Sequence, residues 1–194
     1  MRKIILASQS PRRKWLMQGI FGDNFEIHVS EYEEDNNLDM EPTKLAEKHA
    51  LGKAKDVADK HTTGVVIGGD VFVVYQGKVL GKPVDEEDAF NMLKKILGNI
   101  VDVISSIAVI DIDNNKEYVK HVITKVKMNS LTDEEILAYI KTGDPMDKAG
   151  SFGMQDKGAV VVEKINGCYS NVVGLPLPTL HKILKKIGIK IFDY

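Results

Sequence analysis

Cysteine is almost absent from this chain of 194 residues, in which Cys168 is the only one. One cysteine cannot form an intrachain disulfide, and such a composition is typical of a reducing compartment. Cys168 lacks an accompanying histidine motif, which favours a small packing residue over a nucleophile. Apolar runs long enough to span a membrane are also missing, and the run at residues 4–7 is too short for a signal peptide. We therefore expect a cytoplasmic protein without a membrane partner.

An excess of positive charge is missing as well. The chain has 26 basic and 28 acidic side chains, for a net charge of −2. This balance argues against nucleic acid as a partner, although it allows a local basic site for a small anion. The sequence contains neither a P-loop motif nor G-x-G-x-x-G. No metal-ligand spacing relates the histidines, which are His28, His49, His61, His121 and His181.

What is present indicates an ordinary globular core. Hydrophobic residues make up 43% of the chain and charged residues 28%, which suits one domain over residues 1–194, with or without two lobes. Short apolar runs predict strands at residues 4–7, 25–29, 65–67, 71–74, 101–112 and 118–128. Amphipathic segments predict helices that begin near Pro11, Thr43, Asp85, Thr132 and Pro178.

Turn residues join several of the predicted strands. Residues 159–165 and 169–173 flank Asn166-Gly167 and predict a hairpin, and Asn114-Asn115 predicts a second, longer one. Hairpins interspersed with helices favour a mixed or antiparallel sheet over a doubly wound parallel one. The sequence therefore indicates a mixed α/β fold.

The segment from Ser8 to Arg13 is a candidate anion site. A strand leads into it, Ser10-Pro11 opens a helix, and Arg12 and Arg13 fall in the first helical turn. Backbone N–H groups at a helix N-terminus and guanidinium groups both favour an anion. Two cations there oppose the helix dipole, so a bound polyanion would relieve them. The alternative is that both arginines are solvated on a surface helix.

Carboxylates form a second candidate site. Gly68-Gly69-Asp70 puts a carboxylate where the apolar strand pattern is interrupted, beside glycines that allow close approach of backbone. The loop at residues 31–41 contains six acidic side chains, among them Glu33 and Glu34. Carboxylates near phosphate are favourable only when a divalent cation bridges them. The alternatives are a solvated acidic loop and a turn aspartate.

Three further features carry polar groups. Gly81-Lys82-Pro83 and Lys53 offer ammonium groups that can neutralise phosphate, although most lysines are simply solvated. The glycine-containing segment 147–155 includes Lys148 and Gln155. The amide of Gln155 has a donor and an acceptor that can match a base edge. An irregular loop is the alternative interpretation of that segment.

Together these residues resemble the Maf nucleotide pyrophosphatases. The resemblance rests on eight blocks in family order, Ala7-Ser8-Gln9-Ser10-Pro11-Arg12-Arg13, Ser30-Glu31-Tyr32-Glu33-Glu34, Lys53-Ala54-Lys55, Gly69-Asp70, Leu80-Gly81-Lys82-Pro83, Leu131-Thr132-Asp133-Glu134-Glu135, Gly143-Asp144-Pro145-Met146-Asp147-Lys148-Ala149-Gly150 and Val173-Gly174-Leu175-Pro176. They extend from residue 4 to about residue 187.

The resemblance implies a fold like that of inosine triphosphate pyrophosphatases, a long bent mixed β-sheet with flanking helices and two lobes around a cleft. It also implies a homodimer that depends on Mg²⁺ or Mn²⁺ and releases pyrophosphate by attack of water on the α-phosphate of a nucleoside triphosphate. Asp70 matches the catalytic carboxylate and Glu34, rather than Glu33, the second metal-site acid. The phosphate-binding positions of the family match Ser8, Arg12, Lys53 and Lys82, with Arg13 and Lys148 beside them.

Within the family, Arg12, Arg13 and Gln155 resemble the subgroup that acts on dTTP and UTP. That subgroup usually has threonine after the catalytic aspartate, where this chain has Val71, so a hydroxyl that can contact the base or metal-bound water is missing. A 7-methyl-GTP pyrophosphatase is one alternative function. The other is a nucleotide-binding regulator of cell division without turnover, which would have little need of Asp70 and Glu34.

Overall fold

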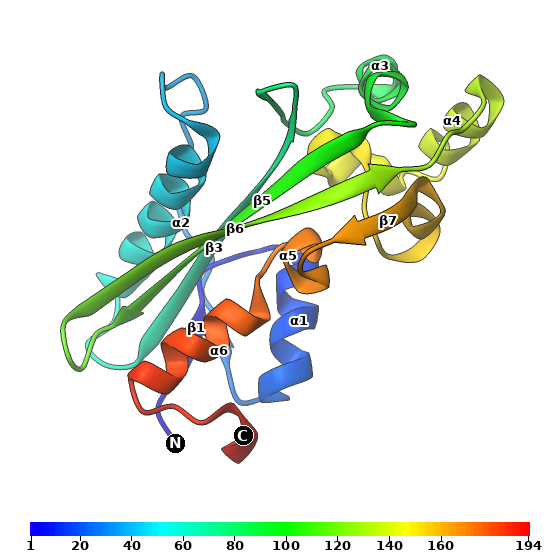
Figure 1. The fold of residues 1–194 in the computed structure, drawn as a ribbon. Helices are drawn as coiled ribbons and strands as arrows, with labels where there is room; N and C mark the ends of the chain where they lie inside the picture. The colour runs from blue at the N-terminus through cyan, green and yellow to red at the C-terminus, as the bar shows by residue number, and fades with distance from the viewer. The chain divides into compact units, whose positions relative to one another are not determined.

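The computed structural model describes residues 1–194, and a single mixed β-sheet runs through it (Figure 1). The strands are β1 (Ile4–Leu6), β2 (Glu26–Ile27), β3 (Val65–Tyr75), β4 (Lys78–Leu80), β5 (Ile100–Asp111), β6 (Lys116–Met128) and β7 (Val162–Asn166). Their order is β2-β1-β3-β5-β6-β7, and β4 pairs with β3. Strand β1 is parallel to β2 and β3, whereas β4 and β7 pair antiparallel with their neighbours. The prediction of a mixed sheet with flanking helices is confirmed.

Six α-helices accompany the sheet, and several begin where the sequence predicts. They are α1 (Pro11–Phe21), α2 (Pro42–Ala58), α3 (Glu86–Ile96), α4 (Asp133–Ile140), α5 (Tyr169–Val173) and α6 (Leu177–Lys186). Ser10 caps α1 and Asp85 caps α3, each through a side-chain oxygen that accepts a backbone N–H. Thr132 and Glu135 form a reciprocal capping box at the start of α4. Short 3₁₀ turns form at residues 144–147, 149–151, 156–161 and 191–193.

The chain forms two compact units. Unit 1 consists of Met1–Asp70, Ser105–Val122 and Gly174–Tyr194, and unit 2 consists of Val71–Ile104 and Ile123–Val173. Strands β3, β5 and β6 each contribute residues to both units.

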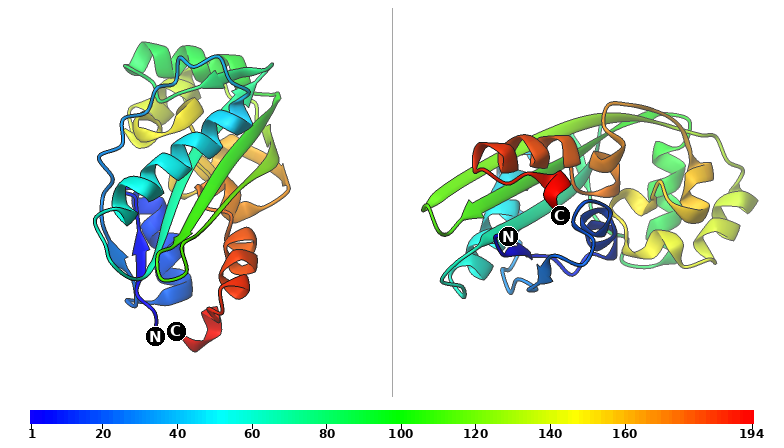
Figure 2. Two further views of the ribbon diagram at one scale, coloured as in Figure 1. Left: turned by 90° about the vertical axis from the view of Figure 1, so that its left-hand side faces the viewer. Right: turned by 90° about the horizontal axis from the view of Figure 1, so that it is seen from below.

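In unit 1 the sheet carries helices on both faces (Figure 2). A Cβ on Gly68 of β3 would meet α2, at the carbonyl oxygen of Ala50 and at Ala54. A Cβ on Gly69 would meet Arg13 of α1 and Leu175, just before α6. Because successive strand residues point to opposite faces, α2 covers one face of β3 and α1 with the start of α6 covers the other. Small and β-branched residues fill the α2 side of this core, including Ala50, Ala54, Val57 and Val66.

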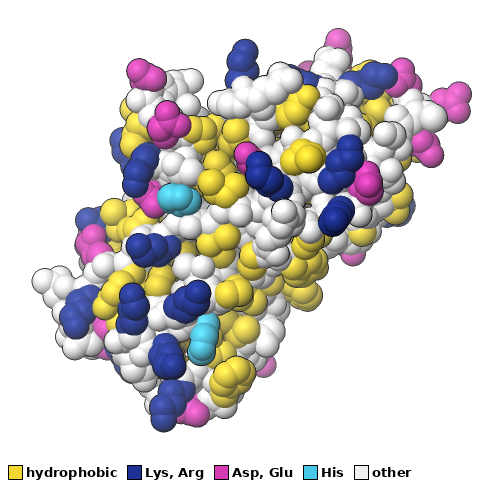
Figure 3. All heavy atoms as spheres, in the orientation of Figure 1, with side chains coloured by type: hydrophobic (Ala, Val, Ile, Leu, Met, Phe, Trp, Pro, Cys, Tyr) yellow, Lys and Arg dark blue, Asp and Glu magenta, His cyan; other side chains and the backbone are white.

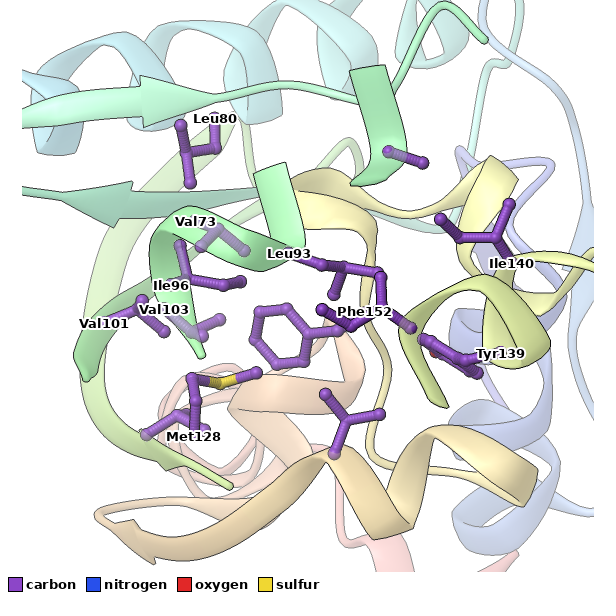
Figure 4. Close-up of a cluster of buried hydrophobic side chains, with 14 residues drawn as sticks. Val73, Leu80, Leu93, Ile96, Val101, Val103, Met128, Tyr139, Ile140 and Phe152 are labelled. Carbon is purple, nitrogen blue, oxygen red and sulfur yellow. The ribbon is translucent and has the colours of Figure 1, made fainter. Parts of the chain in front are cut away.

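Unit 2 has a hydrophobic core of its own (Figure 4). Phe152 lies among side chains from α3, α4 and the strands, with Leu93, Ile96, Val103 and Met128 around it (Figure 4). Leu93 and Ile96 lie on the predicted apolar face of α3 and are fully buried. The glycine-containing segment that the sequence suggested as a base-reading loop therefore also supplies the central aromatic ring of this core.

Basic side chains gather around α6 (Figure 3). Its exposed lysines are Lys182, Lys185 and Lys186, of which the last two lie in the final turn. Cations at that end of a helix interact favourably with the helix dipole, which is a structural explanation for Lys185 and Lys186. None of the helices is both long and apolar enough to cross a lipid bilayer.

The hairpin predicted from residues 159–173 is wrong in its second half. Residues 162–166 form strand β7, which pairs with β6, but Tyr169–Val173 forms helix α5. The β-branched residues suggested a strand, whereas buried polar contacts determine the result. Thr124 accepts a hydrogen bond from the backbone N–H of Cys168, and the fully buried Asn171 donates to Thr124 and to the carbonyl of Val103. These long-range contacts fix a helical turn that local propensity does not favour.

Two other expectations need smaller corrections. The apolar runs on either side of Gly68-Gly69-Asp70 belong to one continuous strand, so the expected interruption is absent. The two glycines serve close packing on the two faces of that strand and do not end it. Strand β2 contains two residues, although the pattern predicted five at 25–29.

Arg2 connects the start of β1 to the hairpin between β5 and β6, and we expect it to stabilise unit 1. Its guanidinium donates to the fully buried carboxylate of Asp111 and to Asp113. Burial alone would raise the pKa of Asp111, but hydrogen bonds from Arg2 and Asn114 outweigh it and hold the pKa below its usual value. The pair therefore stabilises the fold above the usual aspartate pKa and is lost as the pH falls through the lowered folded value.

We predict that Arg2→Met lowers the free energy of unfolding at pH 7 by about 3 kcal/mol, because it leaves a buried carboxylate unpaired. Lys3→Met is the matched control, since Lys3 pairs only with the exposed Glu26 and should cost below about 1 kcal/mol. Urea unfolding measures both. The deficit of Arg2→Met should shrink in acid. Equal effects of the two substitutions would contradict the assignment.

Candidate functional site

The loop between β1 and α1 presents hydroxyl and guanidinium groups at a helix N-terminus. Ser8 follows β1, and its Oγ accepts a hydrogen bond from the backbone N–H of Ser10 over 3.2 Å. Ser10 in turn accepts from the N–H of Arg13 at 3.5 Å. Arg12 is half-buried in the first turn of α1. The predicted anion site thus has the local structure that the sequence indicated.

Arg13 is buried, so the alternative of a solvated arginine is wrong for this residue. Only 7% of it is exposed, its Nη1 donates to Ser8 Oγ over 3.1 Å, and its Nε donates to the Gly174 carbonyl over 2.9 Å. Burial lowers the pKa of Arg13, while the negative charges of Asp70 and Glu34 oppose that shift. A desolvated positive charge therefore lies behind Ser8, close enough to the two carboxylates to interact with them.

Lys53 joins the two carboxylates that the sequence singled out. Its ammonium lies 2.8 Å from Asp70 Oδ1 and 2.5 Å from Glu34 Oε1. Asp70 comes from β3, Lys53 from α2 and Glu34 from the acidic loop, so three separate segments meet here. The neighbouring Glu33 is exposed. The geometry therefore favours Glu34 over Glu33 as the partner of Asp70.

The ion pair changes the acidity of Glu34. Partial burial alone would raise the pKa of this carboxyl group, but the charge and hydrogen bond of Lys53 outweigh burial and lower it. Glu34 is thus held as a carboxylate. Since Lys53 lies between the two acids, its charge offsets the repulsion that would otherwise disfavour two carboxylates at one site.

One oxygen of Asp70 has no partner. The residue is only 6% exposed, and its buried Oδ2 makes no hydrogen bond, while Oδ1 contacts Lys53. A buried unsatisfied carboxylate oxygen is costly and calls for an explanation. A divalent cation fits this donor set. No group of three or more His, Cys, Asp or Glu side chains gathers in the structure, so waters and substrate phosphates would have to complete its coordination, as Mg²⁺ prefers.

Four predicted site residues belong to unit 2. Val71 is partly buried and packs against the hydrophobic core of that unit. Lys82 is exposed, and Gln155 is half-exposed directly before a 3₁₀ turn. Lys148 forms ion pairs with Asp144 at 3.0 Å and Asp147 at 2.7 Å. The charge of Lys148 is therefore already balanced within its own unit.

The sequence interpretation missed Tyr32 and His49. The hydroxyl of Tyr32 lies 3.1 Å from Nδ1 of the fully buried His49, one helical turn before Lys53. Burial, followed by the charges of Glu34 and Asp70, raises the pKa of Tyr32, which keeps its hydroxyl protonated. The available signal was the spacing of polar and small residues on α2 at positions 49, 52, 53 and 56, which fall on one helical face.

Known proteins resemble this chain over nearly its whole length. The family described as Maf-like protein matches residues 3–187. A dTTP/UTP pyrophosphatase of Methanosarcina mazei is 48% identical over 193 residues, covering 100% of this chain and 98% of the relative. Another protein of that name, from Ruminiclostridium cellulolyticum, is 49% identical over 192 residues, covering 98% of this chain and 99% of the relative.

A solved structure supports the fold. The HAM1 protein of Coxiella burnetii superimposes with a TM-score of 0.54 at 15% identity, over 96% of this chain and 100% of that protein. At this identity the likeness bears on architecture alone, and it agrees with the expected mixed α/β fold.

Gly68 lets α2 approach β3, and the distance from Lys53 to Asp70 depends on that approach. A Cβ at residue 68 would lie 2.4 Å from the Ala50 carbonyl oxygen, which is backbone and cannot rotate away. We predict that Gly68→Ala lowers the free energy of unfolding by about 1–3 kcal/mol through overpacking.

Gly19→Ala on α1 is the matched control, because a Cβ there meets nothing within 4 Å. It should stabilise the protein by about 0.5–1 kcal/mol, as alanine is the better helix former. Urea unfolding followed by circular dichroism compares the two variants. A Gly68→Ala protein as stable as the Gly19→Ala protein would show that α2 does not press on residue 68.

Proposed function

This chain belongs to the Maf-like protein family, and on that basis we propose that it is a nucleoside triphosphate pyrophosphatase that cleaves dTTP or UTP to the monophosphate and pyrophosphate. The observation that carries the proposal is the cluster of Lys53, Glu34 and Asp70, with its one unpaired buried oxygen on Asp70. A binding-only regulator would need the cations of such a site but not its carboxylates. The names of the two relatives support the substrate class.

Phosphate binding is the role we assign to the cationic groups. Ser8 and Arg12 offer donors at the N-terminus of α1, where free backbone N–H groups also favour an anion. Arg13 holds Ser8 from behind and adds a buried positive charge. We assign the same role to Lys82 on the basis of the family resemblance, with Lys148 as a further cation once its own carboxylates release it.

Asp70 and Glu34 are the residues that would hold Mg²⁺ or Mn²⁺. A bound divalent ion would supply Lewis-acid polarisation of the phosphate oxygens and a lowered pKa for bound water. Asp70 has a free Oδ2 to orient the attacking water and accept its proton. Lys53 holds Asp70 through Oδ1, so that the second oxygen keeps a fixed direction. The cationic groups then stabilise charge that develops on the departing pyrophosphate.

Base selection is assigned to Gln155. Its amide offers one donor and one acceptor side, which match the 3-NH and a carbonyl of uracil or thymine. Val71 cannot add a hydrogen bond where subgroup members usually have threonine. Since hydrogen-bonding groups reject wrong substrates more strongly than apolar ones, we expect weaker pyrimidine selectivity than threonine would give.

We further propose that residues 1–194 act as one pyrophosphatase domain, because residues 3–187 match a single family, and that two copies form a homodimer. The homodimer rests on the family resemblance alone.

The products of the reaction test the proposed function. We expect UTP and dTTP with Mg²⁺ to yield the monophosphate and pyrophosphate, and we expect EDTA to stop turnover. In ¹⁸O-labelled water the label should appear in the monophosphate, because attack occurs at the α-phosphorus. Orthophosphate with a nucleoside diphosphate would show that the reaction is wrong. A preference for 7-methyl-GTP in a panel with CTP and GTP would overturn the base assignment alone.

Asp70→Asn should separate binding from turnover. The substitution keeps the shape of the side chain but removes a charge and a basic oxygen. We predict that kcat falls at least about a hundredfold, comparable to loss of one major electrostatic group, while UTP binding survives because cations carry it. Asp113→Asn, a carboxylate that pairs with Arg2, is the control and should retain kcat. Turnover of Asp70→Asn within a few-fold of wild type would sink the catalytic assignment.

A further inference from the structure

One face of α2 carries a stripe of residues that contact the acidic loop. His49, Gly52, Lys53 and Asp56 have the i, i+3, i+4, i+7 spacing that places side chains above one another on a helix. Each of the four meets a residue between Ser30 and Asn36. The loop therefore runs back along α2, and this polar face of the helix is a contact surface.

The loop is fastened first at Asp56. Its carboxylate accepts hydrogen bonds from Ser30 Oγ at 2.9 Å and from the backbone N–H of Glu31 at 2.7 Å. Lys60, one turn further along the chain, pairs with Glu31 at 2.8 Å. This contact sets where the loop meets the helix, two residues before Tyr32.

Tyr32 then packs directly on the helix backbone. A Cβ at Gly52 would lie 2.3 Å from the ring of Tyr32, so only glycine allows the ring this close. Glycine in the interior of a helix is unfavourable relative to alanine and needs a packing reason. The close packing of the Tyr32 ring against Gly52 is that reason.

His49 links two points of the loop. Its Nδ1 lies 3.1 Å from the hydroxyl of Tyr32, and its Nε2 lies 3.2 Å from Oδ1 of Asn36. His49 is fully buried, so these bonds are shielded from water. Glu34 lies midway between Tyr32 and Asn36 in sequence, so the backbone is fastened two residues before it and two residues after it.

Glu34 needs such support because its own contact is weak. Its side chain is 37% exposed, and an ion pair of an exposed carboxylate with lysine contributes little by itself. A loop of eleven residues held only by that pair would lose it readily to water and salt.

We propose that Tyr32 and His49 are positioning residues that hold Glu34 beside Lys53 and Asp70 and thereby set the affinity of the site for a divalent cation. This inference rests on the proposed function for the role of the cation. Tyr32 and His49 act through the backbone of residues 33–35.

Two conservative variants test the proposal without opening the core. Tyr32→Phe keeps the ring on Gly52 and removes the hydroxyl, and Asn36→Ala removes an exposed partner of His49. Tyr169→Phe, at a 44% exposed tyrosine in unit 2, is the control. Mn²⁺ affinity is measured by electron paramagnetic resonance in the presence of α,β-methylene-UTP, which has no cleavable α–β bond, so turnover is not required. Hydrogen exchange reports the backbone of residues 33–35.

We expect Tyr32→Phe and Asn36→Ala each to weaken Mn²⁺ binding about tenfold and to speed amide exchange at residues 33–35, with little change in nucleotide affinity or in the urea midpoint. A purely structural role would lower the midpoint and leave Mn²⁺ affinity intact, which would overturn the proposal. Glu34→Gln separates the two hypotheses. If it leaves Mn²⁺ affinity unchanged, the proposed metal role of Glu34 is wrong. If it weakens Mn²⁺ while the other two variants do not, the positioning role is wrong.

Discussion

Helix α2 can lie against strand β3 only because residue 68 has no side chain. The Ala50 carbonyl occupies the space that a Cβ would need, and Ala54 presses on the same point. This backbone contact fixes the distance from the helix to the strand, and therefore whether the ammonium of Lys53 reaches Asp70 two residues later. Lys53 also pairs with Glu34, which lies in a loop that has no regular structure of its own. The carboxylate site is thus a consequence of close packing between two backbones.

On the opposite face of β3, a second glycine makes room for the cationic side chain of Arg13. Gly69 leaves room for Arg13, whose Nε would lie 3.2 Å from a Cβ at that position. The buried guanidinium donates hydrogen bonds to Ser8 and to the Gly174 carbonyl, which offset part of the cost of its burial. Two adjacent glycines in one strand consequently place a positive group on one face and two negative groups with their lysine on the other.

Local chemistry explains which features could be predicted. The starts of α1, α3 and α4 depend on caps within three residues of the helix, and all three lie where the sequence indicates. The pairing of Glu34 with Asp70 came from the family resemblance, since the two residues are far apart in the chain. The prediction of a strand at Tyr169–Val173 is wrong because Asn171 donates hydrogen bonds to Thr124 and to the Val103 carbonyl, and no local sequence pattern contains these contacts. The predicted interruption of β3 at Gly68 is wrong for the same reason. The glycines there are explained by helices that pack on β3 from distant parts of the chain.

Helix α2 shows why a polar helix face should not be assigned to solvent by default. Its apolar stripe is made mostly of alanine and valine, small enough for the short distance to the sheet that Gly68 sets. A long side chain there would push the helix outward and separate Lys53 from Asp70. The adjacent polar stripe is then brought within reach of the acidic loop, so His49 becomes fully buried although it belongs to the hydrophilic side of the helix. A buried imidazole needs partners for both ring nitrogens, and Tyr32 and Asn36 provide them from the loop. The small apolar residues let α2 lie close to the sheet, and the polar stripe beside them holds the acidic loop. Both features are needed for one helix to contact the sheet and the loop at the same time.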